Sequence, residues 1–255
     1  MAQAKATLLG TGTSNGVPSL GKVYPPEFLA DPRNHRMRCS LALQGPAGNV
    51  LVDCTPEMRL QLLRAEIRDL EAVIITHTHA DHVMGMDDLR AFSMHSQRAV
   101  PVYTLPVFQA DIQRIYPYAF AEFPPGIFVP RFELRDVPPV LEVAGMSIQV
   151  LEVEHGPLPC LGVRVNNFAY LTDVSHIPPA AWDQLQGLDV LVLDAVRHKP
   201  HPNHFHLAKA LEVAEALGAR QTFLTHLCDE YDHGPYEKTL PDHIRLAYDG
   251  LSFSV

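Results

Sequence analysis

The sequence predicts an α/β sandwich in which helices cover the outer faces of two β-sheets. Three observations favour it: short apolar runs recur between turn signals, helical patterns lie between some of them, and strand followed by helix occurs twice. The 255 residues are 47% hydrophobic and 19% charged, which supplies a buried core and excludes a largely disordered chain. We expect one large domain that spans residues 1–255.

Short apolar runs bounded by turn residues predict the strands. Several of these runs are apolar throughout, so we expect them to be buried on both faces of a sheet. In chain order, the predicted strands are residues 6–9, 50–53, 72–76, 100–103, 146–153, 161–165, 168–171, 190–193 and 221–224.

Two predicted helices have recognisable ends. Thr-Pro-Glu at residues 55–57 is typical of a helix N-terminus, and apolar residues follow it at helical spacing. The segment 207–217 keeps the same spacing, and Gly218 follows where a C-terminal cap is expected. Prolines cluster at 124–130 and 138–139, and we expect these segments to connect the two halves of the sandwich.

Charge and cysteine content limit the classes of partner. The chain has 20 Lys and Arg against 29 Asp and Glu, a net charge of −9, whereas an extended nucleic-acid surface needs clustered Lys and Arg. No apolar run approaches the roughly 20 residues of a membrane-spanning helix, and no signal peptide is visible at the N-terminus. Four scattered cysteines without a C-x-x-C pair favour free thiols and a cytoplasmic protein.

The strongest functional signal is the segment 77–82, which directly follows the apolar run 72–76. It holds four potential metal ligands within six residues: His77, His79, Asp81 and His82. His77 and His79 are two apart, so they project to the same side of an extended strand end. Asp81 and His82 are neighbours, so we expect their side chains to diverge and to serve two different ions. The segment therefore predicts a dinuclear metal centre, with a histidine-rich solvated loop as the alternative.

Two ions need more ligands than one loop supplies. Three further apolar runs end in a suitable side chain, namely His155, Asp173 and His226. A carboxylate such as Asp173 can bridge two ions, and the histidines can complete the coordination of each. Each residue alone could be an ordinary polar strand end, but their order after the histidine-rich loop favours ligands.

These features together resemble the metallo-β-lactamase superfamily. The glycine-rich start at 9–18 and the segments 31–34 and 246–251 are similar to its phosphodiesterase branch. That branch includes the cyclic-phosphate hydrolase of the carbon–phosphorus lyase pathway and, more distantly, the tRNA 3′-processing endonucleases. The similarity covers about residues 6–254 and implies a four-layer αββα sandwich with the metal centre at one edge.

The resemblance also implies a role for each candidate residue. Two divalent ions would be held by His77, His79 and His155 for the first, Asp81, His82 and His226 for the second, and Asp173 for both. Asp53 would support the metal loop from behind the ligands, and His204 and Asp81 would be the catalytic residues. Zinc, manganese or iron suits such a nitrogen and oxygen ligand set.

The implied function is a phosphodiesterase that cleaves a small cyclic or linear phosphodiester with a hydroxide shared by two ions. The alternatives are a tRNA 3′-end endonuclease, a non-catalytic metal-binding accessory protein of cofactor biosynthesis, and a thioester or lactone hydrolase. The acidic charge counts against the endonuclease, and the complete ligand set with His204 counts against the accessory protein. Arg90, His201 and His206 are candidates for substrate contact, and a homodimer is left open.

Overall fold

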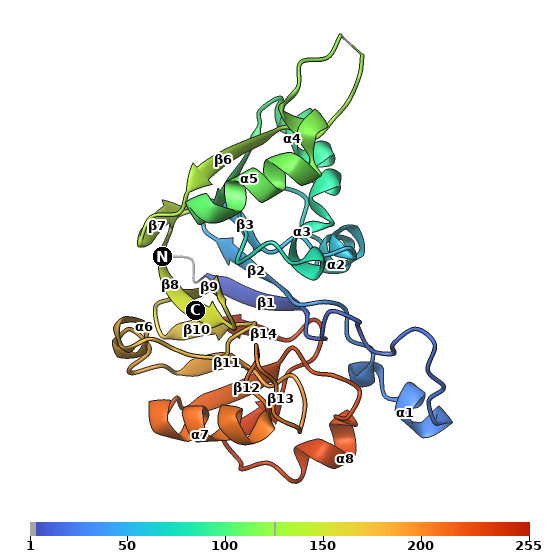
Figure 1. The fold of residues 1–255 in the computed structure, drawn as a ribbon, viewed down its shortest axis with the longest axis vertical. Coiled ribbons are helices and arrows are strands. Elements are labelled where there is room, and N and C mark those ends of the chain that lie inside the picture. The colour runs from blue at the N-terminus through green and yellow to red at the C-terminus, as the bar shows by residue number, and fades with distance from the viewer. Residues whose placement is uncertain (1–3, 125) are drawn as a thin grey trace.

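Two β-sheets form the centre of the molecule (Figure 1). The structure, a computed structural model, describes residues 4–124 and 126–255, and within them each sheet has seven strands. The first sheet has the order β14 (Ser252–Ser254), β1 (Lys5–Gly10), β2 (Ser40–Gly45), β3 (Gly48–Val52), β4 (Ala72–Ile74), β5 (Val100–Thr104), β6 (Phe132–Asp136). The second has the order β13 (Ile244–Leu246), β12 (Gln221–Thr225), β11 (Val190–Asp194), β10 (Phe168–Leu171), β9 (Leu158–Val165), β8 (Met146–His155), β7 (Val140–Val143).

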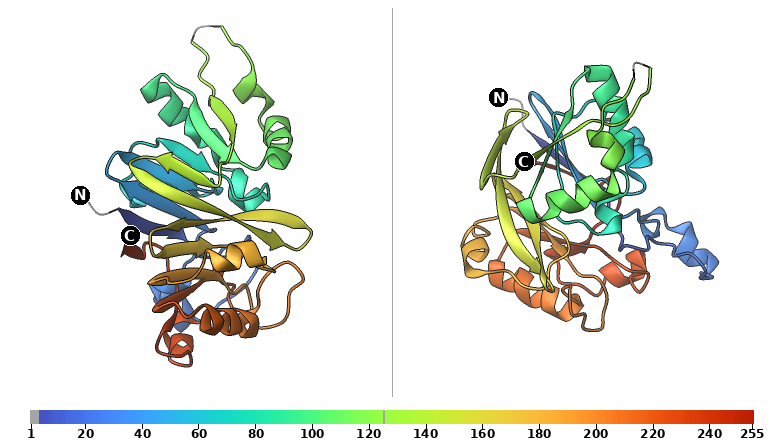
Figure 2. Two further views of the ribbon diagram at one scale, coloured as in Figure 1. Left: turned by 90° about the vertical axis from the view of Figure 1, so that its left-hand side faces the viewer. Right: turned by 45° about the horizontal axis from the view of Figure 1, so that its top comes forward.

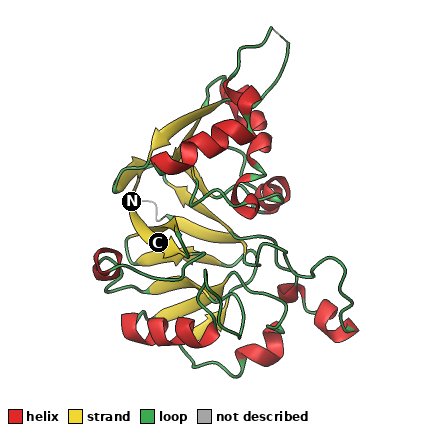
Figure 3. Ribbon diagram, viewed as in Figure 1, coloured by secondary structure: helices red, strands yellow, loops and turns green. Residues whose placement is uncertain are grey.

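The helices lie outside the sheets, as the views in Figures 2 and 3 show. Those of the first half are α2 (Met58–Arg64), α3 (Ala80–Val83), α4 (Arg90–Ser96), α5 (Pro106–Ile115), and the short 3₁₀ turns η2 (Met86–Leu89) and η3 (Pro117–Phe120). Those of the second half are α6 (Pro179–Asp183), α7 (Leu207–Leu217) and α8 (His233–Glu237). A separate arm that carries α1 (Pro26–Ala30) and η1 (Pro32–Asn34) projects to one side in Figure 1.

Three hydrophobic clusters correspond to the spaces between four layers. Along β3, Val50 and Val52 belong to the cluster between the sheets, whereas Leu51 packs with residues of α2 and α5. Along β10, Tyr170 belongs to the cluster between the sheets, whereas Leu171 packs on the side of α7. Successive strand residues point to opposite faces, so a strand buried on both sides must be apolar throughout. The four-layer αββα prediction is confirmed.

Two features of the chain path qualify the predicted connection between the halves. Residues 138–139 lie between β6 and β7, and therefore link the sheets as expected. The segment 124–130, of which residue 125 lies outside the described residues, precedes β6. Since β6 pairs in parallel with β5, this segment belongs to the first half, and that part of the prediction was wrong.

The strand directions bring the site to one edge. In the second sheet β10, β11 and β12 are parallel, so their carboxyl ends meet at the same edge. Strand β8 has the same direction as β10, because both are antiparallel to β9. In the first sheet β3 and β4 are parallel neighbours. No helix among residues 4–124 and 126–255 has the length and apolar character needed to cross a bilayer.

Candidate metal centre

The predicted metal ligands converge from both sheets. His77 and His79 follow β4, and Asp81 and His82 lie in α3 directly after them. The other three lie at the carboxyl ends of strands of the second sheet: His155 in β8, Asp173 after β10 and His226 after β12. The seven side chains form two groups in which the potential ligand atoms lie within 4.8 Å of one another.

The first group consists of His77, His79 and His155. The Nδ1 atom of His79 lies 2.9 Å from His77 Nε2 and 3.2 Å from His155 Nε2. The other ring nitrogen of His155 donates to the carbonyl oxygen of Asn203 at 2.7 Å, which leaves Nε2 free to face the group. Three imidazole nitrogens are thus directed at one point.

The second group consists of Asp81, His82, Asp173 and His226. Asp81 Oδ2 lies 3.3 Å from His82 Nε2 and 3.8 Å from His226 Nε2. The expectation that Asp81 and His82 diverge was wrong. Both residues lie in the helical turn α3 and not in the extended strand end that precedes it. Their side chains belong to the same group of potential ligands.

Asp173 lies between the two groups. Its Oδ2 atom is 3.8 Å from His77 Nε2 and 3.9 Å from His155 Nε2, on the side of the first group. Its Oδ1 atom is 3.4 Å from both His82 Nε2 and His226 Nε2, on the side of the second group. One carboxylate therefore offers a separate oxygen to each cluster of imidazoles.

The donor set fits a pair of divalent ions. Ligand atoms that surround a zinc ion tetrahedrally at about 2.1 Å lie roughly 3.4 Å apart, which is close to the separations found here. His82 Nε2 and both ring nitrogens of His226 are buried and have no hydrogen-bond partner among the described residues. Buried polar atoms without partners are rare and costly, and a cation would satisfy them.

The electrostatics of the two groups differ. Burial alone would lower the pKa of His226, but Asp173, Asp81 and Asp194 outweigh it and raise this pKa to about 9. In the first group burial lowers the pKa of His155 to about 4, despite the attraction of Asp173. The carboxylates thus concentrate negative charge at the second group, where a cation would compete with the proton on His226, whereas burial favours the neutral ring of His155.

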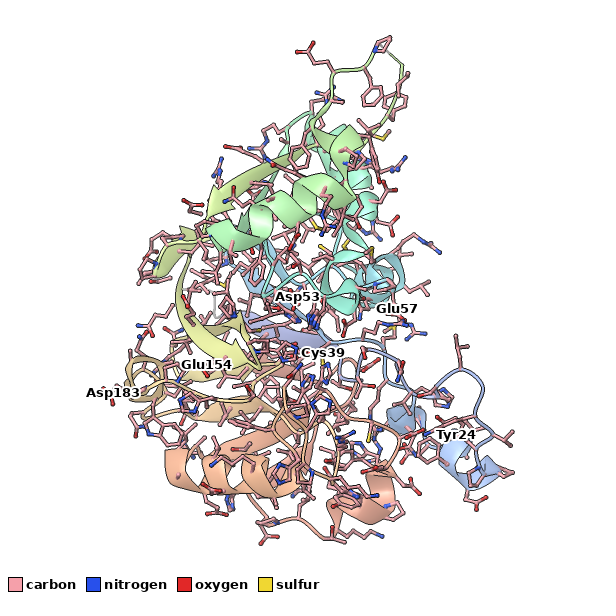
Figure 4. The ribbon with its side chains drawn as sticks, viewed as in Figure 1. Tyr24, Cys39, Asp53, Glu57, Glu154 and Asp183 are labelled. Atoms are coloured by element: carbon pink, nitrogen blue, oxygen red, sulfur yellow. The ribbon has the colours of Figure 1, made fainter. Side chains whose placement is uncertain are left out.

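Asp53 lies behind the candidate metal ligands (Figure 4, where it is labelled near the middle of the molecule). It is fully buried, and Thr76 donates to it from both its backbone nitrogen and its hydroxyl at 2.8 Å. His82 Nδ1 also donates to Asp53, at 2.7 Å. This contact fixes the ring of His82 so that Nε2 faces Asp81 and Asp173, which is how a carboxylate behind a histidine ligand acts.

His204 lies beside both groups and is oriented by Asp194. Its Nδ1 atom donates to Asp194 Oδ2 at 2.8 Å, and its Nε2 atom is 4.0 Å from Asp173 Oδ2. Sequence reasoning did not identify Asp194, although the signal was present. The run 190–193 is apolar and ends in an aspartate, the same pattern that pointed to Asp173.

A cavity of about 490 Å³ opens beside His204 and His226. Among the described residues, His201 belongs to its wall, whereas Arg90 and His206 do not. His206 immediately precedes α7, and Arg90 forms an ion pair with Asp87. The structure therefore brings one of the three candidate substrate contacts to the centre.

Three of the site residues have strained backbones. The φ angles of Asp53, Asp173 and His226 are 66°, 43° and 57°, in the left-handed region that residues other than glycine seldom adopt. Each lies just after a strand, where the chain must turn sharply to present its side chain inward. Such strain costs about 1–3 kcal/mol at each position and is concentrated at functional sites.

A family model described as a β-lactamase superfamily domain matches residues 48–227. The chain belongs to the metallo-β-lactamase superfamily. A crystal structure of a diphosphatase from the PhnP family is 37% identical, covers 99% of this chain and 98% of its own, and superimposes with a TM-score of 0.89. Human short-form tRNase Z shares the fold at 18% identity and a TM-score of 0.70, over 98% of each chain.

Curated relatives of this superfamily hydrolase include two differently named enzymes. An octanoyltransferase of Porphyromonas gingivalis is 36% identical over 97% of this chain, which spans about half (51%) of that relative's length. A ribonuclease Z of Anoxybacillus flavithermus is 25% identical over 97% of both chains. The predicted superfamily and its enzymatic, hydrolytic character are confirmed.

Proposed function

We propose that this protein is a dinuclear metal-dependent phosphodiesterase that cleaves a small phosphodiester. The observation that carries the proposal is the position of Asp173, whose two oxygens each face one group of imidazoles. Two divalent ions at these groups would act as Lewis acids and supply a nucleophilic water at neutral pH. Zinc and manganese suit the ligand set best, and iron is the third choice.

His204 is the candidate proton donor. Asp194 accepts from its Nδ1, so Nε2 is the nitrogen that faces the substrate space next to Asp173. In hydrolysis the oxygen of water bonds to phosphorus and one of its protons passes to solvent, the bond to the leaving oxygen breaks, and the leaving oxygen takes a proton. Protonated His204 can deliver that proton from Nε2, a contribution of roughly 10²–10⁴-fold in rate.

The test combines metal analysis with turnover of bis(p-nitrophenyl) phosphate. We expect about two ions per chain, loss of turnover and of one ion in Asp81→Ala, and retained ions with slow turnover in His204→Ala. His243→Ala is the matched control, because His243 forms a peripheral ion pair with Glu215 at 3.0 Å. A metal-loaded wild-type protein that leaves the diester intact would refute the proposal.

Cleavage of tRNA precursors is a second candidate, favoured by the ribonuclease Z relative that aligns over 97% of both chains. The net charge of −9 opposes it, because a tRNA-sized polyanion needs an extended basic surface. Incubation with a tRNA precursor that carries a labelled 3′ trailer separates the two activities. We expect no discrete trailer product under conditions that turn over the small diester.

Hydrolysis of acyl esters or thioesters is raised by the match to half of an octanoyltransferase. The cavity next to the centre argues against it, since Thr13, Ser14, Asn15 and Arg38 line it. An apolar acyl chain would gain little there and would displace water from polar groups that it cannot bond. We therefore expect p-nitrophenyl octanoate to be a much poorer substrate than the phosphodiester.

A further inference from the structure

His226 differs from His82 and His155 in how its ring is held. The rings of His82 and His155 each donate through Nδ1 to an oxygen that lies away from the centre, at 2.7 Å in both cases. Both ring nitrogens of His226 lack a hydrogen-bond partner among the described residues. No group behind the ring fixes its direction, so the position of His226 depends on the backbone at the carboxyl end of β12.

The residue after His226 is clamped by the glycine-rich start of the chain. The backbone nitrogen of Leu227 donates to the carbonyl oxygen of Thr11 at 2.9 Å, and its carbonyl oxygen accepts from the backbone nitrogen of Thr13 at 3.3 Å. Gly12 pairs with Leu227 as in a parallel strand. Since the glycine-rich segment follows β1 and Leu227 follows β12, this clamp joins the two sheets at the edge that holds the site.

Asp249 holds the clamp through Thr11. Its Oδ1 accepts from the Thr11 hydroxyl at 2.8 Å, and its Oδ2 accepts from the backbone nitrogen of Met37 at 2.7 Å. The carbonyl oxygen of Met37 in turn accepts from the backbone nitrogen of Gly12 at 2.8 Å. The segments pack so closely that a Cβ at Gly12 would lie 2.8 Å from the carbonyl oxygen of Arg36. One carboxylate therefore ties together segments that are distant in the sequence.

The backbone of His226 has a reason to move if the clamp loosens. Its φ angle of 57° lies in the left-handed region that residues other than glycine seldom adopt. In this conformation Nε2 lies 3.4 Å from Asp173 Oδ1 and 3.8 Å from Asp81 Oδ2. The two hydrogen bonds of Leu227 oppose a return to a relaxed backbone, which would carry the ring away from these carboxylates.

We propose that Asp249 is a positioning residue for the second metal group, on which it acts through Thr11 and the backbone that follows His226. The proposal rests on the two-ion part of the function proposed above, whatever the substrate. Asp249 belongs to neither group of potential ligands, and the first group comes from other segments. Loss of the tie should therefore weaken the ion at the second group and spare the ion at the first.

The experiment titrates the metal-free protein with Zn²⁺ in competition with a chromophoric chelator, which yields a dissociation constant for each ion. His226→Ala identifies the constant of the second group, because it removes a ligand there. In Thr11→Val, which keeps the shape and loses the hydroxyl, this constant should rise about 10-fold while the other stays unchanged. Thr11→Ser keeps the hydroxyl and should retain both wild-type constants.

Substitution of Asp249 itself should give the same selectivity. Asp249→Ala should raise the second constant at least as much as Thr11→Val. Asp249→Asn should largely rescue it, because the amide oxygen can accept from the Met37 nitrogen while the amide group donates to the Thr11 hydroxyl. A role in general stability would not separate the two constants in this way.

Thr7→Val is the matched control. Thr7 is also a buried threonine at the start of the chain, but its hydroxyl bonds to Ser252 Oγ at 3.0 Å, where β1 pairs with β14. This variant should keep both constants. A wild-type second constant in both Thr11→Val and Asp249→Ala, or an equal rise in both constants, would overturn the positioning role and leave the two-ion proposal standing. A wild type that binds no second ion would overturn both proposals.

Hydrogen exchange on the metal-free protein tests the tie without an ion. The Leu227 amide should be protected in the wild type and should exchange about 10-fold faster in Thr11→Val and Asp249→Ala, but not in Thr7→Val. Unchanged protection in both variants would refute the link from Asp249 to the backbone beside His226.

Discussion

Replacement of Asp194 by Asn tests whether His204 works as an oriented proton donor. Asp194 is fully buried, and its Oδ2 accepts from His204 Nδ1 at 2.8 Å and from the backbone nitrogen of Val174 at 3.0 Å. Because one oxygen accepts both contacts, an asparagine oxygen at that position can still accept from Val174 and from His204. The amide nitrogen then takes the place of Oδ1, which is buried and has no partner among the described residues. The ring keeps its tautomer, but the charge that balances a protonated imidazole is lost.

The expected loss follows from this geometry. The contact is short and buried, so the carboxylate both selects the ring tautomer and stabilises the cationic form. A comparable aspartate-to-asparagine change behind a catalytic histidine in serine proteases lowers kcat by about 10⁴. Here the ring lies partly open to the cavity, with an exposed side-chain fraction of 11%, which weakens the effect. We therefore expect a loss of about 10²–10³ in kcat.

The assay is turnover of the aryl phosphodiester, with metal content measured on the same preparations. Asp194→Asn, His204→Ala and the double variant form a cycle. If Asp194 acts through His204, the aspartate substitution should cost almost nothing once the histidine is absent. An undiminished loss in the His204→Ala background would refute the reasoning. Loss of metal in Asp194→Asn would instead show that Asp194 supports the neighbouring His226.

Three further predictions concern metal binding, pH and packing. Asp173→Ala should reduce the metal content below about two ions per chain and abolish turnover, and a chelator should lower the Tm of the wild type but hardly that of the variant. Burial raises the pKa of Asp249 to about 7, despite its bonds from the Met37 nitrogen and the Thr11 hydroxyl. The folded state then binds more protons than the unfolded state between about pH 4 and 7. The contribution of Asp249 to the free energy of unfolding is therefore present below this window. As the pH rises through the window, this contribution, at most about 4 kcal/mol, is lost. Urea unfolding at pH 4.5 and 7.5 should show a smaller pH dependence for Asp249→Asn, and an equal dependence would contradict the assignment. Gly85→Ala should lower stability by about 3 kcal/mol, because the new Cβ would lie 1.9 Å from the carbonyl oxygen of Thr55; an unchanged Tm would refute this.

The sequence allowed most of the candidate centre to be predicted, because the residues that could bind metal come in recognisable local patterns. A histidine-rich segment directly after an apolar strand predicts metal binding without further information. A polar residue at the end of an apolar run predicts a strand end that faces the site. The same rule points to Asp194, which follows the apolar run 190–193. No role was predicted for this carboxylate, because the resemblance assigned every ligand to another residue.

Other features depend on long-range contacts that no local pattern contains. Strand β6 pairs with β5 of the first sheet and not with a strand of the second sheet, and only the assembled sheet shows this. The tie between Asp249 and Thr11 joins residues that lie 238 positions apart, and it acts on Leu227, which comes from a third segment. A sequence shows that carboxylates and hydroxyls are present but does not show which of them are bonded to each other.

The backbone strain at Asp53, Asp173 and His226 links the fold to the function. Three residues with left-handed backbone angles cost about 1–3 kcal/mol of strain each, which would be enough to unfold a loosely packed edge of a sheet. Here they follow strands β3, β10 and β12, whose side chains are anchored in clusters on both faces of their sheets. The packed layers thus impose a backbone geometry that the residues would not adopt alone, and this geometry holds the candidate ligands in place without an ion. Replacing Asp173 by Gly would relieve the strain, so it should lose less stability than Asp173→Ala while losing metal equally; a larger loss of stability in the glycine variant would show that the strain is not stored there.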